Sequence, residues 1–140
     1  MSADFFDSNL FVYMFDPTDT RKRDLARDLV SRAVAERNAS ISHQVVQETL
    51  NVVTSKMASR LTREDTGRLL DEVLVPLWDI MPTVTTFERA LDIRARYGFA
   101  FYDALIVASA IEGGCTRLYS EDFQHGKRIG SLVIENPFLN

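Results

Sequence analysis

The sequence of 140 residues has little of several residue types, and each shortage excludes a class of protein. A single cysteine, Cys115, allows no internal disulfide and no cysteine-based zinc site. No apolar run approaches the ~20 residues that a membrane-spanning helix needs. The first ten residues carry acids where a secretory signal carries Lys or Arg, so we expect a cytoplasmic protein. The sequence also lacks a Pro/Gly-rich linker, which predicts a single domain over residues 1–140.

Positive charge is not in excess either. The 16 Lys and Arg residues are outnumbered by 20 Asp and Glu residues, which gives a formal net charge of -4. Taken alone, this balance argues against a generic nucleic-acid binder. With 46% hydrophobic and 26% charged residues, the composition is that of an ordinary globular protein and excludes disordered and low-complexity classes.

What the sequence does contain is an alternation of short apolar runs with longer helical patterns. Strands that are separated by helices imply right-handed crossovers and a mostly parallel sheet covered on both faces. The pattern therefore predicts an α/β fold of the three-layer α/β/α sandwich type. The strand-length runs are residues 3–6, 39–41, 75–80, 116–119 and 132–134.

Capping residues and apolar stripes mark the expected helices. Pairs with capping-box spacing predict helices that begin after Thr62 and after Thr85, whose partners are Asp65 and Glu88. Gly98 and the Gly113–Gly114 pair predict helix ends, because a left-handed residue there is cheapest as glycine. Two amphipathic stripes are Leu25, Leu29 and Ala33 within residues 20–37, and Val46, Leu50, Val53 and Met57 after the candidate N-cap Ser42.

Acidic side chains stand at the ends of the expected strands. Asp7 comes directly after the first strand, and Asp122 follows the strand that ends at residue 119. Asp103 opens a helix that is apolar on nearly every side, and Glu48 lies one turn into its own helix. In open α/β sheets, ligands bind beyond the carboxyl ends of the strands. We therefore expect these four carboxylates to meet in one cleft.

Four carboxylates in one cleft raise one another's pKa values, and a divalent metal ion removes that conflict. Ligation by oxygen alone, with no Cys or His at ligand spacing, selects Mg²⁺ or Mn²⁺ over zinc. Such ions activate water and neutralise charge on phosphate, which suits phosphodiester hydrolysis. Simpler roles stay open for each acid: Asp7 or Ser8 as the cap of a short helix over residues 9–15, Asp103 at a positive helix end, and Glu48 and Asp122 as surface residues.

Four segments of the chain, in order, resemble the motif blocks of PIN-domain ribonucleases, and more closely those of the VapC-like toxins of bacterial type II toxin–antitoxin modules. The segments are FFDSNLFVYMFD, SHQVVQETLNV, FYDALIVASAI and LYSEDFQHG. The resemblance implies a PIN-like α/β/α sandwich with a mostly parallel, roughly five-stranded sheet. It also implies an acidic Mg²⁺ or Mn²⁺ site that cleaves single-stranded RNA.

The resemblance assigns roles to individual residues and implies partners. The family's four catalytic and metal-binding acids fall on Asp7, Glu48, Asp103 and Asp122, and its supporting positions fall on Ser8, Asn9 and Ser120. Glu121 lies outside this set. The implied partners are an RNA substrate, a cognate antitoxin whose C-terminal segment approaches the acidic cleft, and a second copy of the chain in a homodimer.

Several other polar residues are candidates for RNA contact. Lys56 and Arg60 lie near the end of the Glu48 helix, and His125 lies in the loop after Asp122. The basic residues between positions 21 and 37 alternate with acids, which favours a solvated helix face. Aromatic residues between positions 11 and 15 either stack bases or belong to the core or a dimer contact.

The leading hypothesis is a metal-dependent endoribonuclease, and the alternative is a non-catalytic RNA- or protein-binding module on the same scaffold. A phospho-signalling receiver needs a lysine near the end of its last strand, and residues 131–140 contain none. A haloacid-dehalogenase-type phosphatase needs a second Asp two residues after the first, where this chain has Asn9. Without the four proposed ligands the chain has no formal net charge, so its acidity belongs to the expected site.

Overall fold

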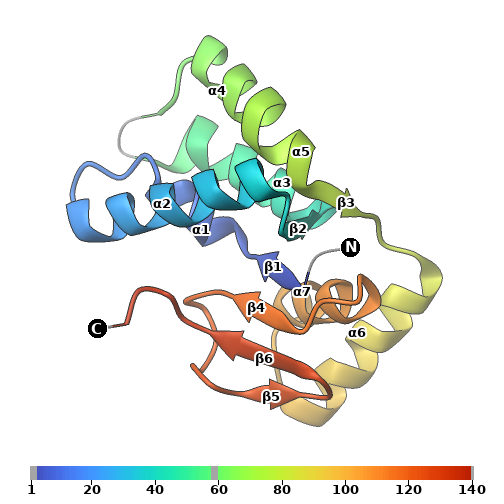
Figure 1. Cartoon of the computed structure of the whole chain (residues 1–140). Coiled ribbons are helices and arrows are strands. Elements are labelled where there is room, and N and C mark those ends of the chain that lie inside the picture. The colour runs from blue at the N-terminus through green and yellow to red at the C-terminus, as the bar shows by residue number, and fades with distance from the viewer. Residues whose placement is uncertain (1–2, 58–59, 140) are drawn as a thin grey trace.

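A six-stranded sheet forms the centre of the computed structural model, which describes residues 3–57 and 60–139 (Figure 1). The strand order is β3-β2-β1-β4-β6-β5, in which five strands are parallel and the short edge strand β5 runs antiparallel to β6. The mostly parallel sandwich expected from the sequence is confirmed, with one strand more than expected. The strands are β1 (Asp4–Phe6), β2 (Ala39–Ser42), β3 (Trp78–Ile80), β4 (Arg117–Tyr119), β5 (Arg128–Ile129) and β6 (Leu132–Glu135).

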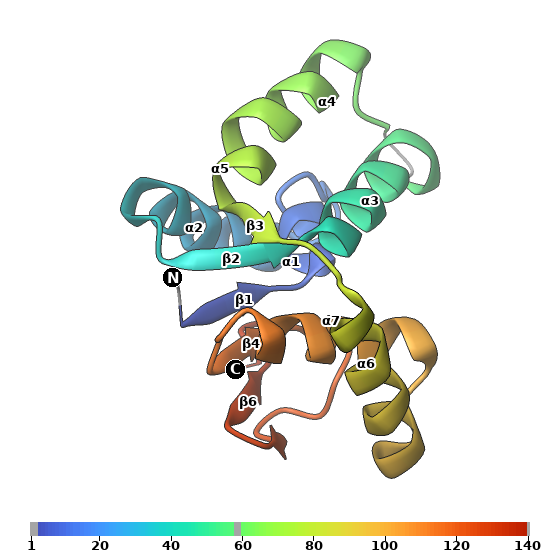
Figure 2. The same cartoon turned by 90° about the vertical axis from the view of Figure 1, so that its right-hand side faces the viewer.

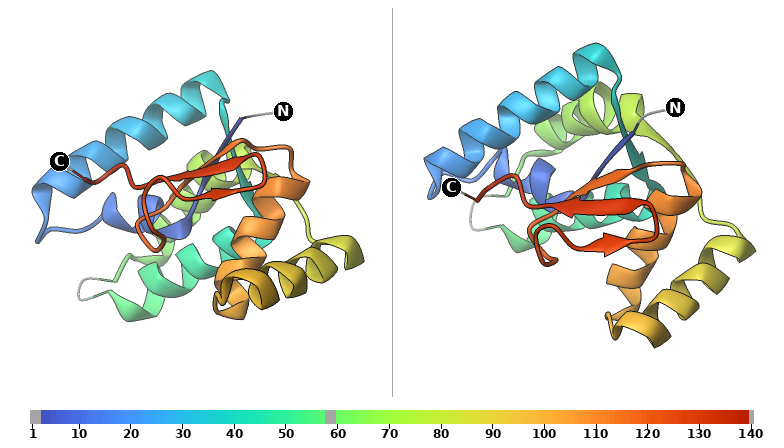
Figure 3. Two further views of the ribbon diagram at one scale, coloured as in Figure 1. Left: turned by 90° about the horizontal axis from the view of Figure 1, so that it is seen from below. Right: turned by 60° about the horizontal axis from the view of Figure 1, so that its bottom comes forward.

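Helices cover both faces of this sheet. Helix α2 lies on one side, and α6 and α7 lie on the other (Figure 3). The α-helices are α1 (Ser8–Tyr13), α2 (Thr20–Glu36), α3 (His43–Asn51), α4 (Arg63–Leu69), α5 (Val75–Leu77), α6 (Val84–Tyr97) and α7 (Phe101–Glu112). Two π-helical turns, η1 (Val52–Lys56) and η2 (Leu70–Leu74), continue α3 and α4. No helix in the described part of the chain is long and apolar enough to cross a membrane, and the cytoplasmic location stays a prediction.

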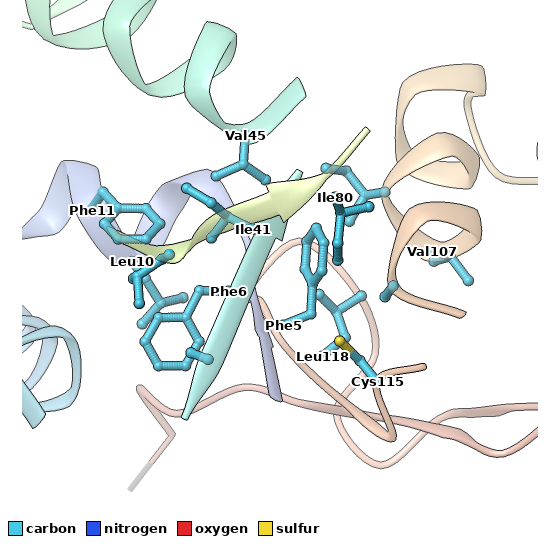
Figure 4. Close-up of a cluster of buried hydrophobic side chains, with 14 of the residues drawn as sticks. Phe5, Phe6, Leu10, Phe11, Ile41, Val45, Ile80, Val107, Cys115 and Leu118 are labelled. Atoms are coloured by element: carbon cyan, nitrogen blue, oxygen red, sulfur yellow. The ribbon is translucent and has the colours of Figure 1, made fainter. Parts of the chain in front are cut away.

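The core follows from the alternation of side chains along β1. Successive strand residues point to opposite faces, so Phe5 and Phe6 enter different layers. The Phe6 ring packs against Phe11 of α1 with 6.3 Å between ring centroids, while Phe5 lies beside Leu118 on the α7 side (Figure 4). Helix α7 is buried from Ala104 to Ala110, which explains why its sequence is apolar on nearly every side.

Helix α6 begins two residues earlier than the capping-box spacing of Thr85 and Glu88 predicted. The cap is Thr83, whose backbone N–H donates to Thr86 Oγ1 over 3.0 Å while Thr86 N–H donates back to Thr83 Oγ1 over 3.4 Å. A threonine therefore takes the place of the expected acid. The helix ends where expected, at Gly98, whose φ of 75° is the left-handed conformation that favours glycine.

Other sequence expectations need smaller corrections. Residues 75–80 divide into helix α5 and strand β3, because a short apolar run does not distinguish a strand from a buried helical turn. The fully buried stripe of α2 is Ala26, Val30 and Ala33, with Leu25 and Leu29 half-buried at its edge. Ser42 stands at the N-cap of α3, but its hydroxyl makes no capping hydrogen bond and has no partner among the described residues.

Candidate active site at the carboxyl ends of the strands

Parallel pairing of β1 and β4 brings the ends of two chain segments together. Phe6 is paired with Tyr119 in this register, and the backbone N–H of Asp7 donates to the Tyr119 carbonyl over 3.0 Å. The residues that follow each strand therefore lie at one edge of the sheet. A cavity of about 250 Å³ opens there, and its wall includes Asp7, Glu48, Asp103 and Asp122. The structure thus brings all four expected carboxylates into one cleft.

Asp7 is the buried centre of the site, with 3% of its surface exposed. It is also the N-cap of α1: its Oδ1 accepts the Ser8 backbone N–H at 2.7 Å, and its Oδ2 accepts the Ser120 hydroxyl at 2.7 Å. Burial raises the pKa of Asp7 to about 7, with a further contribution from the charges of Asp122 and Glu48. The capping role and the place in the acidic cleft belong to the same side chain.

Glu48 is held from two sides of the cleft. Its Oε2 accepts a hydrogen bond from Gln44 Nε2 at 3.1 Å, and its Oε1 accepts one from Ser8 Oγ at 3.4 Å. Gln44 also donates to the Tyr102 carbonyl over 3.0 Å, which ties α3 to the first turn of α7. Burial raises the pKa of Glu48, and the charges of Asp103 and Asp122 add to that rise.

Asp103 and Asp122 form the more open side of the cleft. Helix α7 begins at Phe101, two residues before the position expected from the sequence, and Asp103 therefore stands in its first turn, where the positive helix end favours a carboxylate. Desolvation and the charge of Asp122 raise the pKa of Asp103. Desolvation also raises the pKa of Asp122, whose exposed side chain accepts a hydrogen bond from Asn9 Nδ2 at 3.3 Å.

Ser120 connects the acids at the bottom of the cleft. Its fully buried hydroxyl donates to Asp7 and accepts the Asp122 backbone N–H at 3.1 Å and Asn9 Nδ2 at 3.4 Å. The three supporting residues expected from the resemblance, Ser8, Asn9 and Ser120, therefore all contact an acid of the cleft. Asn9 Oδ1 is buried and has no hydrogen-bond partner among the described residues.

The donor set fits a hard divalent cation. All four acids supply oxygen, and burial raises the pKa of all four, with added repulsion from neighbouring carboxylates. Within residues 3–57 and 60–139, no three carboxylate, imidazole or thiol side chains are arranged so that they could hold a metal ion. The four carboxylates nevertheless line one cavity.

The π-helical turn η1 brings a cation to this acidic wall. Lys56 lines the cavity, eight residues after Glu48. In a uniform α-helix of 3.6 residues per turn, the seventh residue would share the Glu48 face. A π-turn contains one residue more than an α-turn, so the eighth residue takes that place. Asn51 also lines the cavity, although the sequence analysis did not predict it. Its position three residues after Glu48 on one helix places both side chains on the same face and could have indicated this.

Two candidates for RNA contact lie away from this cavity. His125 lines a different groove with Tyr119 and Glu135, and its Nδ1 accepts the Asn136 backbone N–H at 3.0 Å. Arg60 is exposed and is not part of the cavity wall. Glu121 is not part of the cavity wall and forms an ion pair of 3.0 Å with Lys22 of α2.

Comparisons with known proteins agree with this architecture. The family model of the PIN domain matches residues 5–128. No curated protein sequence matches the chain. The model resembles a toxin–antitoxin complex from Klebsiella pneumoniae, with a TM-score of 0.68 and 19% identity over 96% of this chain and 98% of the other.

Two further solved structures share the fold. VapC20 of Mycobacterium tuberculosis, described as a sarcin-ricin loop cleaving toxin, matches with a TM-score of 0.61 and 19% identity over 85% of this chain and 89% of its own. VapBC2 from Rickettsia felis, bound to a DNA fragment from its promoter, matches with a TM-score of 0.67 and 22% identity, covering 95% and 97%. At such identities the likeness shows a common fold.

Proposed function

The chain belongs to the PIN domain family, and on this premise we propose that it is a metal-dependent endoribonuclease, the toxin of a VapC-type toxin–antitoxin pair. One observation carries the proposal: Asp7, Glu48, Asp103 and Asp122, which come from four separate segments of the chain, line one cavity at the carboxyl ends of the strands. A structural role for each acid separately does not explain their convergence, because like charges at close range oppose one another.

Mg²⁺ or Mn²⁺ is the proposed cofactor, with Asp7, Glu48, Asp103 and Asp122 as its ligands. When bound, such an ion supplies an activated water and stabilises the negative charge that develops on a phosphate during hydrolysis. The ion also favours the ionised form of each carboxylate, which burial and mutual repulsion otherwise oppose.

The protein's own contribution is to orient the acids before the substrate arrives. Asp7 is fixed through both oxygens by Ser8 N–H and Ser120 Oγ, so its carboxylate plane is set by the start of α1 and the end of β4. Gln44 orients Glu48 in the same way, because its side-chain amide donates a hydrogen bond to Glu48 Oε2. Side chains held by their neighbours need little reorganisation during the reaction, which is a large part of catalytic power. Lys56 lines the same cavity, and we propose that it contacts a phosphate of the substrate.

Single-stranded RNA is the proposed substrate, and a cognate antitoxin and a second copy of the chain are the proposed partners. The similar structure from Klebsiella pneumoniae is a toxin–antitoxin complex, and that from Rickettsia felis is VapBC2 bound to promoter DNA, which supports an antitoxin as partner. For the homodimer, the support is an apolar surface of α6, where Val84, Phe87 and Leu91 are 76%, 42% and 57% exposed. Such side chains are typical of surfaces that another protein covers.

The test is hydrolysis of a broad panel of RNAs by the purified chain, free of any partner, in Mn²⁺ and in EDTA. We expect cleavage in Mn²⁺ only, and we expect Asp7→Asn and Asp103→Asn to abolish it while the circular dichroism spectrum stays native. Asp92→Asn is the matched control, since Asp92 is an exposed acid of α6. If both site variants still cut RNA, the proposal is wrong. If the wild type binds RNA and leaves the whole panel uncut, the non-catalytic binding module is the better description.

A further inference from the structure

A group of aromatic side chains lies where the α6–α7 turn meets the loop between β4 and β5. The rings of Tyr97 and Phe99 are stacked, with centroids 5.8 Å apart and planes inclined by 17°, and Phe123 meets Phe99 edge-on at 5.4 Å. Lys127, which precedes β5, lies against Tyr97 at the end of α6, and Figure 2 shows the chain between β4 and β5 beside that helix. All three rings are half-buried and keep part of their surface open to solvent. We call Tyr97, Phe99 and Phe123 the aromatic platform.

Two cations stand over this platform. Lys127 Nζ lies 5.3 Å from the centroid of the Tyr97 ring, and Arg96 Cζ lies 5.5 Å from the same centroid. Neither cation forms an ion pair with a carboxylate in the described part of the chain. In a chain whose acids outnumber its bases, cations without acidic partners beside half-buried aromatic rings are a specific surface feature. Their charges remain available to an anionic ligand.

Two residues of the platform lie close in sequence to acids of the cleft. Phe123 directly follows Asp122, and Phe99 stands four residues before Asp103. Both acids belong to the cavity wall, and Lys56 belongs to the same wall on the α3 and η1 side. We therefore infer that a strand longer than the cavity, leaving it past Asp103 and Asp122, reaches the aromatic rings.

We propose that the aromatic platform and its two cations bind single-stranded RNA beside the cleaved phosphodiester, with about one or two bases stacked on the rings. Unpaired RNA bases expose apolar faces that stack on aromatic side chains, and the adjoining phosphates need positive charge. Stacking uses the face that all bases share, so this surface contributes affinity and direction along the strand more than sequence choice. The inference rests on the proposed function, because it takes RNA as the substrate of the cleft.

The aromatic contribution is measured by RNA binding in the Asp7→Asn background, where cleavage does not interfere. The probe is a fluorescein-labelled single-stranded RNA of about 12 nucleotides and random sequence, followed by fluorescence anisotropy in EDTA. Tyr97→Leu and Phe123→Leu keep apolar volume and remove the aromatic face, and we expect each to weaken binding about tenfold. Trp78→Leu is the matched control, since Trp78 is a half-buried aromatic residue of β3 at the opposite edge of the sheet, and we expect no change.

The charge contribution is read from salt dependence. Lys127→Gln should weaken binding and lower the slope of log K against log salt concentration by about 0.7, the value for one phosphate contact on a single strand. Arg32→Gln removes an exposed cation of α2 that is already paired with Asp28, and its slope should equal that of the parent. Lys127 is only half-buried, so the Lys127→Gln variant still tests RNA binding by this surface if an aromatic variant fails to fold.

Native-like variants at Tyr97, Phe123 and Lys127 that bind the RNA as tightly as their controls would overturn the inference, and the rings would then serve only to pack the loop onto α6. This failure differs from failure of the proposed function. A chain that cuts RNA equally well with and without the platform contradicts the platform alone. A wild-type chain that loses RNA binding on platform substitution but never cuts RNA contradicts the hydrolytic function alone.

Discussion

Removing the charge of Asp7 should stabilise the metal-free protein while destroying its proposed activity. The side chain is 3% exposed, and its pKa is raised from 3.8 to about 7, mainly by burial. A shift of about 3 units corresponds to about 4 kcal/mol of lost folding stability above pH 7. In Asp7→Asn the amide oxygen still caps α1, but the contact with Ser120 is weakened at a cost of about 1 kcal/mol. The expected net gain is about 2 to 3 kcal/mol, or about 5 to 10 °C in Tm.

The gain has a defined pH dependence. A carboxyl group whose pKa is raised by folding holds its proton more tightly in the folded state than in the unfolded state. Wild-type stability therefore falls as the pH rises from about 4 to about 7, and the advantage of Asp7→Asn grows over the same interval. The two proteins should be nearly equal near pH 4 and differ fully at pH 8.

The assay is urea unfolding in EDTA at pH 4, 6 and 8, followed by circular dichroism. Asp92→Asn, a change of the same type at an exposed position of α6, should leave the free energy of unfolding within about 0.5 kcal/mol of wild type. If Asp7→Asn is equally stable or less stable than wild type at pH 8, then the ionised Asp7 carboxylate does not destabilise the folded protein. A cation would then not be needed to offset its charge.

Three further outcomes are expected. Mn²⁺ at 100 times its dissociation constant should stabilise the wild type by about 2.7 kcal/mol and Asp7→Asn much less, as measured by thermal unfolding; equal stabilisation would place the ion elsewhere. Ser120→Ala removes the hydroxyl that donates to Asp7 and should lower the rate of RNA cleavage by about 10- to 100-fold with a native spectrum, whereas an unchanged rate would show that this hydrogen bond does not position the acid. His125→Ala should leave kcat/KM within about twofold of wild type, because His125 lies in another groove; a large loss would return it to the site.

The sequence predicted the acids of the site well, because their positions depend on few variables. Asp7 and Asp122 each follow a strand, and parallel neighbouring strands end at a common edge, so their convergence follows from the topology. The PIN-domain match over residues 5–128 confirms the resemblance that carried the remaining assignments. The roles of the acids in catalysis and metal binding stay predictions.

Features that depend on contacts between distant segments of the chain could not be predicted from the sequence. In the platform, Phe99 packs against Phe123, and no local sequence pattern predicts a contact between residues so far apart in the chain. The aromatic residues considered for base stacking instead include Phe11, which is fully buried in the core. Strand β5 has two residues, too few for a periodic pattern, and exists because it pairs with β6. The sequence did not predict the cap at Thr83, because Thr86 stands at the position where the capping-box motif has an acid.

The π-turn η1 has a consequence for the spacing of the site along the sequence. A turn of this kind amounts to a single-residue insertion that the helix absorbs locally. Deleting Thr54, an exposed residue of that turn, should restore α-helical winding and leave the lysine seven residues after Glu48, still on the cleft face. RNA affinity should then survive the deletion, while replacement of Lys56 by Gln should not preserve it. A lysine at either of these two spacings from Glu48 would therefore present its charge to the same face of the cleft.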